Sequence, residues 1–128
     1  MKKEKKVIYS VNAPDPVGPY SQAIEIDSFV YISGQIPISK SEGGLLVSTI
    51  EKETEQVMEN IKCILDTAKL SFGNIVKSSI FVTDMDNFSK INEVYGSYFQ
   101  SDPPARETVE VRRLPMNARV EISCIACR

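Results

Sequence analysis

Two stretches of the sequence carry apolar residues at the three- and four-residue spacing of an amphipathic helix. The first helix is predicted over residues 50–69, with an apolar stripe of Val57, Ile61, Ile64, Leu65 and Ala68. Ser48 and Glu51 fit the S-x-x-E capping box at its start. The second helix is predicted to follow Asp86 as its cap, with a stripe of Phe88, Ile91, Tyr95 and Phe99. Two helices can cover one face of a sheet but not both.

The other ordered segments have the composition or alternation of β-strands. Strands are predicted over residues 7–10, 23–26, 29–34, 75–82, 106–111 and 119–127, and Asp27-Ser28 joins the second and third in a hairpin. Residues 12–20 and 35–47 contain the proline and glycine of loops. The order β-β-β-α-β-α-β-β in 128 residues predicts one domain over residues 1–128. We expect an α+β two-layer sandwich, with a mixed sheet and both helices on one face.

Alternation within the last two strands predicts which side chains the helices cover. Val120, Ile122, Cys124 and Ala126 share one face of the last strand, and Val109 and Val111 share one face of the strand before it. The opposite face is then predicted to carry Arg106 and Thr108 together with Glu121. That face mixes apolar and charged groups, so it is either solvated or packed against other copies of the chain.

The composition excludes several classes of chemistry. The sequence has no histidine, which removes Ser-His-Asp and Cys-His nucleophiles and histidine-based zinc sites. The formal net charge of −2 gives no attraction to nucleic acid or to an anionic membrane. The longest uninterrupted apolar runs, such as residues 29–32, are four residues long, too short to span a bilayer. No apolar stretch follows the charged residues 1–6, so we expect no signal peptide and a cytoplasmic protein.

The cysteines favour a reducing compartment. The sequence has three of them, an odd number. Cys124 and Cys127 match C-x-x-C, but strand alternation would place them on opposite faces of one strand. We therefore expect neither a redox site nor a metal site.

A few polar residues are candidates for chemistry. Arg106 follows Pro-Pro-Ala at the start of a strand, and its guanidinium suits a carboxylate; equally, it is a surface or ion-paired arginine. Glu121 can position water and move protons, or pair with a neighbouring arginine. Tyr20 follows Gly18-Pro19 in a stiff loop and is either a site residue or a packed tyrosine with its hydroxyl in water. Asn92 lies off the main apolar stripe of the second helix and is either a site residue or a solvated polar residue. On these residues alone, the sequence indicates an α+β domain with a candidate carboxylate site.

The chain resembles the RidA (YjgF) family of imine deaminases along essentially its whole length, and the order and spacing of the matching blocks make the likeness specific. The matching stretches are Ala13-Pro14, Gly18-Pro19-Tyr20-Ser21-Gln22-Ala23, Ser33-Gly34-Gln35-Ile36-Pro37, Ile75-Val76-Lys77, Phe81-Val82 with Asp84, residues 88–95, Pro104-Ala105-Arg106, Val109-Glu110-Val111, Leu114-Pro115 and Val120-Glu121-Ile122.

The resemblance implies a chorismate-mutase-like fold and a homotrimer whose sheets line a central barrel. Its sites would lie between neighbouring subunits and would hydrolyse small 2-imino acids, or their enamine tautomers, to 2-keto acids and ammonia without a cofactor. Arg106 matches the arginine that binds the substrate carboxylate, and Glu121 the glutamate that positions water or transfers protons. The residues matching the lining of the cleft are Tyr20, Ser33, Gly34 and Asn92. Many members have cysteine where this chain has Thr108, which bears on substrate preference.

Two other functional classes stay open. One is a trimer that binds ligands or regulates without turnover. The other is the translation inhibition or endoribonuclease activity described for relatives. The lack of histidine and the slightly acidic charge argue against RNA chemistry.

Overall fold

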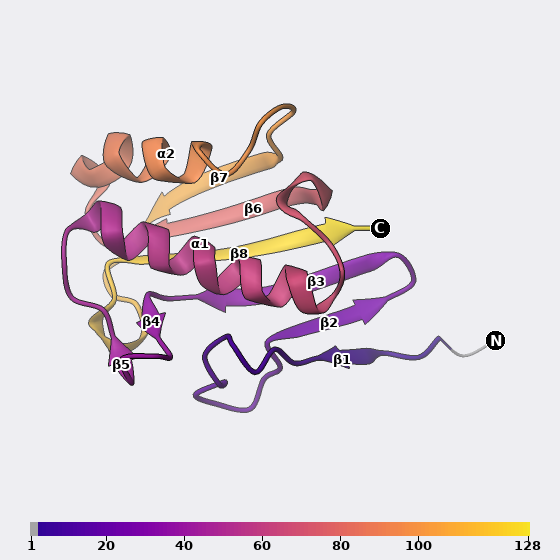
Figure 1. Cartoon of the computed structure of the whole chain (residues 1–128). Helices are drawn as coiled ribbons and strands as arrows, with labels where there is room; N and C mark the ends of the chain where they lie inside the picture. Colours follow the sequence, from indigo (N-terminus) through magenta and orange to yellow (C-terminus); the bar gives the residue numbers. More distant parts are fainter. Residues whose placement is uncertain (1–2) are drawn as a thin grey trace.

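The computed structural model describes residues 3–128 and has two layers, a mixed six-stranded sheet and two helices that lie over one of its faces (Figure 1). In spatial order the strands are β1 (Lys6–Ile8), β2 (Ala23–Ile26), β3 (Phe29–Gln35), β8 (Val120–Cys127), β6 (Ile75–Val82) and β7 (Ala105–Glu110). Neighbours are antiparallel except β6 and β7, which are parallel and are connected through α2. The helices are α1 (Ile50–Thr67) and α2 (Phe88–Gly96). The predicted α+β class and the helices on one face are confirmed.

The core lies between the helices and the covered face of the sheet. The alternation in β8 is as predicted: Val120, Ile122, Cys124 and Ala126 are buried while the residues between them are half-buried. The apolar stripe of α1 packs on this row, with Val57, Ile61 and Ile64 fully buried. Complete burial of one such side chain stabilises the fold by about 2 kcal/mol.

Both helix starts differ in detail from the prediction. Thr49, not Ser48, caps α1, because its hydroxyl accepts a hydrogen bond from Lys52 N at 3.2 Å. The carboxylate that reaches back to Ser48 N is that of Glu53, at 3.0 Å, so the predicted Ser48–Glu51 box is wrong. Glu53 is also bound by Arg119 at 2.7 Å, which ties the start of α1 to the sheet. The helix ends at Thr67, two residues before the prediction.

The predicted cap of α2 is also wrong. Asp86 lies inside a short 3₁₀ turn, Met85–Asn87, that precedes the helix. Asp84 caps that turn by accepting a hydrogen bond from Asp86 N at 2.9 Å. The segment predicted as one loop over residues 35–47 contains a small separate hairpin, β4 (Ile38–Ser39) paired with β5 (Gly44–Leu45).

The largest correction concerns the faces of β7. In the parallel register Arg106 lies beside Ser78 and Thr108 beside Ile80, and both of these partners are buried under the helices. Val109 lies instead on the open face and is 42% exposed. The prediction that Val109 faces the helices while Arg106 shares the open face with Glu121 is therefore wrong. The physical reason is that α2 presents aromatic rings to β7, and these rings cover an arginine instead of valines.

The open face of the sheet carries apolar and charged groups side by side. Register places Tyr31 of β3, Ile125 of β8 and Lys77 of β6 in one row across this face. Phe29 and Tyr31 are 40% and 45% exposed, and Lys77 pairs with Glu107 at 2.7 Å. No helix or strand of residues 3–128 covers this row.

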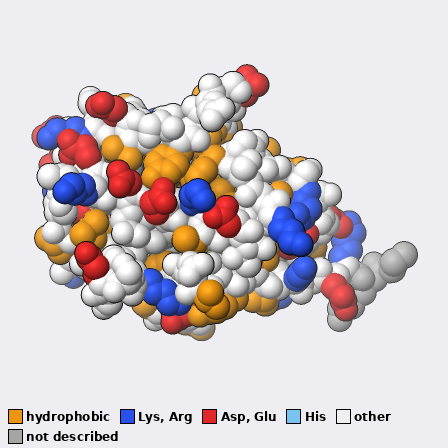
Figure 2. Space-filling view, in the orientation of Figure 1, with side chains coloured by type: hydrophobic (Ala, Val, Ile, Leu, Met, Phe, Trp, Pro, Cys, Tyr) orange, Lys and Arg blue, Asp and Glu red, His pale blue; other side chains and the backbone are white. Residues whose placement is uncertain are grey.

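The helix-bearing face has a mixed surface. In Figure 2, acidic and basic side chains are interspersed over most of it. Among residues 3–128, no helix has the length and apolar content needed to cross a bilayer.

Candidate functional site

Glu121 lies on the open face of β8, against a bulge in β3. The register of β3 and β8 shifts between Ile32 and Gln35, so Ser33 and Gly34 together oppose one residue of β8. A Cβ on residue 34 would lie 2.6 Å from Glu121 Oε2. Only glycine allows the carboxyl group to lie this close to the β3 backbone.

The carboxyl group of Glu121 is held without a counter-charge. Its side chain is half-buried, and burial raises its pKa above the usual carboxyl value. No cation within residues 3–128 offsets this effect. A carboxyl group in this environment exchanges protons nearer to neutral pH than an exposed one, which suits a general acid or base.

A small cleft of about 40 Å³ lies beside Glu121. Its lining includes Tyr20, Gly34, Ile36 and Pro115. This volume exceeds the minimum that a water molecule needs. The cleft therefore has room for a water next to a carboxyl group whose pKa is raised by burial.

Tyr20 and Ser33 are fixed beside this cleft by hydrogen bonds. The Tyr20 hydroxyl accepts from Val17 N at 3.2 Å, and the Ser33 hydroxyl donates to Ser21 O at 2.6 Å. The stiff loop that carries Tyr20 is anchored by the buried side chain of Gln22. Its amide accepts from Ser10 N and donates to the carbonyl oxygens of Ser10 and Pro14.

Arg106 lies on the other side of the sheet, between β7 and α2. Its guanidinium carbon is 5.1 Å from the centroid of the Tyr95 ring and 5.7 Å from that of Phe88. These are cation–π distances. No carboxylate of residues 3–128 forms an ion pair with Arg106. The half-buried guanidinium therefore keeps donors available for an external anion.

Thr108 and Asn92 belong to the same region. Thr108 points to the helix side two residues after Arg106, and its Oγ1 is the one buried side-chain oxygen or nitrogen of residues 3–128 with no hydrogen-bond partner. Asn92 is half-buried and follows Phe88 by four residues, which places it next to Phe88 on the surface of α2. An unpaired hydroxyl, an amide and a free guanidinium suit a polar, anionic ligand.

The predicted site residues thus form two groups within one chain. Tyr20, Ser33, Gly34 and Glu121 gather at the β3–β8 bulge. Arg106, Thr108 and Asn92 gather between the edge strand β7 and α2. The structure brings together the members of each group, but it separates the two groups by the sheet.

The sequence reasoning did not identify the rings of Phe88 and Tyr95 as neighbours of Arg106, because both residues read as core positions of a helix. Ser78 and Pro115 were also missed. The helical spacing of Phe88, Asn92 and Tyr95 is the signal that links the two rings to a predicted site residue.

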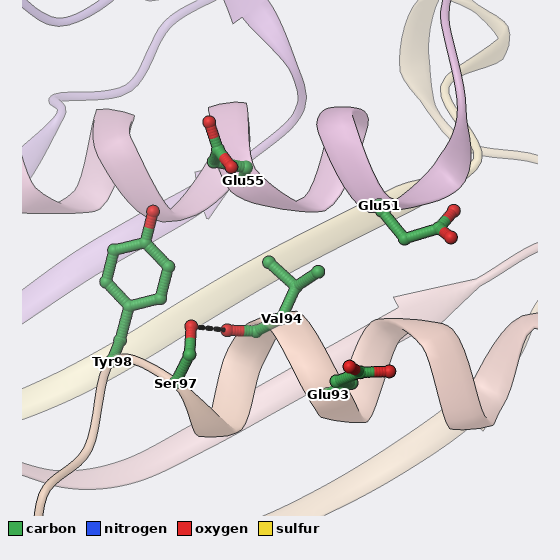
Figure 3. Close-up of a pocket in the computed structure, with 6 residues that line it drawn as sticks. All are labelled: Glu51, Glu55, Glu93, Val94, Ser97 and Tyr98. Carbon is green, nitrogen blue, oxygen red and sulfur yellow. Dashed lines mark hydrogen bonds between the residues drawn. The ribbon is translucent and has the colours of Figure 1, made fainter.

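A larger hollow, of about 430 Å³, lies between α1 and α2 and contains none of the predicted residues (Figure 3). Its lining includes Glu51, Glu55, Glu93 and Tyr98. Three carboxylates repel an anionic substrate, so this hollow is unsuited to a 2-imino acid.

Metal-binding geometry is lacking in the described part of the chain, where no group of three or more His, Cys, Asp or Glu side chains could hold an ion. Cys124 is buried and Cys127 lies on the opposite face of β8, as predicted. Burial raises the pKa of the Cys124 thiol to about 11, which is unlike a reactive cysteine.

Known proteins with similar sequences match nearly the whole length of this chain. A family model described as endoribonuclease L-PSP matches residues 10–128. A RutC family protein of Pyrococcus horikoshii is 48% identical over 95% of this chain and 97% of that protein. The mouse 2-iminobutanoate/2-iminopropanoate deaminase is 42% identical over 95% of this chain and 90% of that protein.

A solved structure has the same fold. It is a protein of the conserved Rid family from Yersinia pestis, with a TM-score of 0.95 and 47% identity, covering 98% of this chain and 100% of that chain. Together with the match of the family model to residues 10–128, these similarities show that the chain belongs to the RidA (YjgF) family.

Proposed function

We propose that this protein is a cytoplasmic, cofactor-independent deaminase that hydrolyses 2-imino acids such as 2-iminobutanoate and 2-iminopropanoate to 2-keto acids and ammonia. The observation that carries the proposal is the Arg106 guanidinium, which lies over two aromatic rings and has no acidic partner in residues 3–128. A planar carboxylate can accept two parallel hydrogen bonds from such a group. Thr108 Oγ1 and Asn92 supply further polar contacts for the same ligand.

Glu121 would supply the proton transfers. Water adds to C2 of the protonated imine while the Glu121 carboxylate takes one proton from that water. The protonated Glu121 then gives this proton to the amine nitrogen of the resulting carbinolamine. The C2–N bond breaks as the keto C=O forms, and the hydroxyl proton leaves with ammonia as ammonium. The raised pKa of Glu121 and the adjoining water-sized cleft support this role.

A complete site requires more than one copy of the chain. Arg106 and Glu121 lie on opposite faces of the sheet, so a single small substrate cannot contact both in one subunit. The exposed Phe29 and Tyr31 on the open face, and the edge strand β7, leave surface for further copies. These observations support an assembly of several copies, and the family resemblance makes that assembly a homotrimer in which Arg106 of one subunit and Glu121 of a neighbour line each site.

The relatives support the activity at different levels. The mouse protein, 42% identical, carries the deaminase name. The archaeal relative, 48% identical, carries only a family name. The histidine-free sequence fits the imine reaction, because an iminium carbon is already electrophilic and needs no nucleophilic side chain.

A coupled assay tests the proposal. Threonine dehydratase releases 2-iminobutanoate from threonine, and 2-ketobutyrate formation is followed while semicarbazide competes for the imine. We expect acceleration by the wild type and none by Arg106→Ala. Arg128→Ala is the matched control, because Arg128 pairs with Glu25 at the far end of β8 and is expected to leave the rate unchanged.

Two results would contradict the proposal: a wild-type protein that leaves keto-acid release unchanged, and full activity in Arg106→Ala. The second result would remove the contact between Arg106 and the substrate carboxylate from the mechanism. In the first case, binding of 2-ketobutyrate by the wild type but not by Arg106→Ala would make the chain a ligand-binding protein.

A further inference from the structure

We propose that Tyr95 is a positioning residue for Arg106, and that a buried polar chain through Ser78 to Cys124 fixes the Tyr95 ring. This inference rests on the proposed function, because it concerns how the same site holds its carboxylate. It adds an α2 residue and a β6 residue that do not themselves touch the substrate.

Arg106 lies against two aromatic rings of α2. Tyr95 is only 4% exposed, and its ring centroid is 5.1 Å from the guanidinium carbon. Phe88 lies seven residues earlier on the same helix, at 5.7 Å. An arginine on an edge strand has many rotamers, and two ring faces from one rigid helix reduce that freedom.

A buried hydrogen bond anchors the Tyr95 ring to β6. Its hydroxyl donates to Ser78 Oγ at 3.0 Å, and Ser78 is fully buried. Ser78 Oγ lies 3.6 Å from Cys124 Sγ, which completes a chain of three polar groups inside the core.

The Ser78 anchor lies in the same row of the sheet as Arg106. Ser78 is the register partner of Arg106 in β7 and of Cys124 in β8. The hydroxyl of Tyr95 is therefore bound to the same transverse row of the sheet that carries Arg106. The Tyr95 hydroxyl is bound to Ser78, and Ser78 is paired with Arg106 on the adjacent strand. Loss of this hydrogen bond would let the Tyr95 ring move relative to the Arg106 guanidinium.

The chemistry explains why rings suit this task better than a carboxylate. A carboxylate would neutralise the guanidinium and occupy its N–H donors. Aromatic faces contact the plane of the guanidinium and leave the donors at its edge available. Tyr95 would thus orient Arg106 without competing with the substrate.

Steady-state kinetics and direct binding test the inference on the assembled protein. For Tyr95→Leu, which removes the ring, we expect KM for the imine and Kd for 2-ketobutyrate to rise about tenfold, with kcat within about threefold of wild type. Tyr95→Phe and Ser78→Ala each remove one end of the anchor and are expected to raise KM about threefold. The double variant should raise KM no more than the larger single change, because both ends act as one unit.

Tyr98→Phe is the matched control. The Tyr98 hydroxyl donates to Glu59 at 2.7 Å, and its ring packs on Phe72 in the neighbouring aromatic cluster, but it does not contact Arg106. We expect wild-type KM and Kd. The unfolding temperature and solution mass of each variant are measured alongside, since a purely structural role lowers stability and leaves KM unchanged.

The outcomes separate this inference from the proposed function. Wild-type turnover together with wild-type KM and Kd in the three single variants at Tyr95 and Ser78 would overturn the inference and leave the function standing. Absence of wild-type turnover would overturn the function; the inference then stands if binding of 2-ketobutyrate depends on Arg106 and weakens in Tyr95→Phe and Ser78→Ala. Wild-type protein that neither accelerates keto-acid release nor binds 2-ketobutyrate would overturn both.

Discussion

The carboxyl group of Glu121 lies so close to Gly34 that any side chain at position 34 must displace it: a Cβ there would be 2.6 Å from Oε2 and 2.8 Å from the carboxyl carbon. In Gly34→Ala we expect kcat for imine hydrolysis to fall at least about tenfold, because the general base moves away from its water. Overpacking should also cost about 1–3 kcal/mol of unfolding free energy. Urea unfolding and the coupled assay measure both effects.

Gly44→Ala is the control for that substitution, because a Cβ built there has no heavy atom within 4 Å beyond those of Gly44 and its two chain neighbours. It should retain wild-type turnover. Wild-type kcat in Gly34→Ala as well would show that the position of the Glu121 carboxyl group is irrelevant to the rate.

The pH dependence of the reaction should report Glu121. Burial raises the pKa of this carboxyl group, so the acid limb of kcat/KM is expected above the usual range of an exposed glutamate. In Glu121→Gln the residual rate should lack that limb. A limb that persists unchanged in Glu121→Gln would assign the titration to another group.

The raised pKa of Glu121 also makes the stability of the fold depend on pH. Because the pKa is higher in the folded than in the unfolded chain, the folded state binds this proton more tightly. The stabilisation that the bound proton gives to the folded state is fully present below the pKa that Glu121 has in the unfolded chain. It is lost as the pH rises through the pKa that Glu121 has in the folded chain. The difference between the unfolding temperatures of Glu121→Gln and wild type should therefore become more positive from pH 4 to pH 8, roughly the range that brackets a raised carboxyl pKa. A difference that stays constant over this range would contradict the prediction.

Complementation between two inactive variants tests the shared site. Arg106→Ala keeps Glu121, and Glu121→Gln keeps Arg106. When the two are co-expressed in equal amounts, random mixing gives about a quarter of the intersubunit sites both intact residues. We therefore expect about a quarter of wild-type activity from the mixture and almost none from either variant alone. No recovery in mixed trimers of verified composition would show that Arg106 and Glu121 do not act together in one intersubunit site.

Thr108 should show opposite effects on binding and stability. Its Oγ1 is buried without a partner, so the nearly isosteric change Thr108→Val removes an unsatisfied group and should leave the unfolding temperature unchanged or higher. If the hydroxyl contacts the substrate, KM should rise about three- to tenfold. Thermal unfolding and kinetics on one preparation decide this, and an unchanged KM would exclude a substrate contact.

The sequence predicted well what depends on local periodicity. The strand alternation of β8 and the apolar stripe of α1 each involve four or more apolar positions, and both are confirmed. The cap of α1 was misplaced by one residue, and the carboxylate that binds Ser48 N is that of Glu53, which also binds Arg119, 66 positions away in the sequence. A local capping pattern contains no information about such a partner.

The faces of the site required three-dimensional information. β7 has a charged residue on each face, Arg106 on one and Glu107 on the other, so its sequence does not say which side α2 covers. The parallel register with β6 decides it, and places Arg106 away from Glu121. The bulge at Ser33–Gly34 likewise depends on the pairing of β3 with β8, although the glycine itself marked the position.

Under the proposed function, the separation of Arg106 and Glu121 by the sheet leaves each folded chain with two incomplete half-sites. Under the proposed assembly, catalysis then depends on concentration: dilution below the dissociation constant of the assembly would abolish turnover while leaving every chain folded. A newly synthesised subunit would stay inert until it met its neighbours, so the cell's supply of the chain would set how many active sites exist as well as how much protein is present.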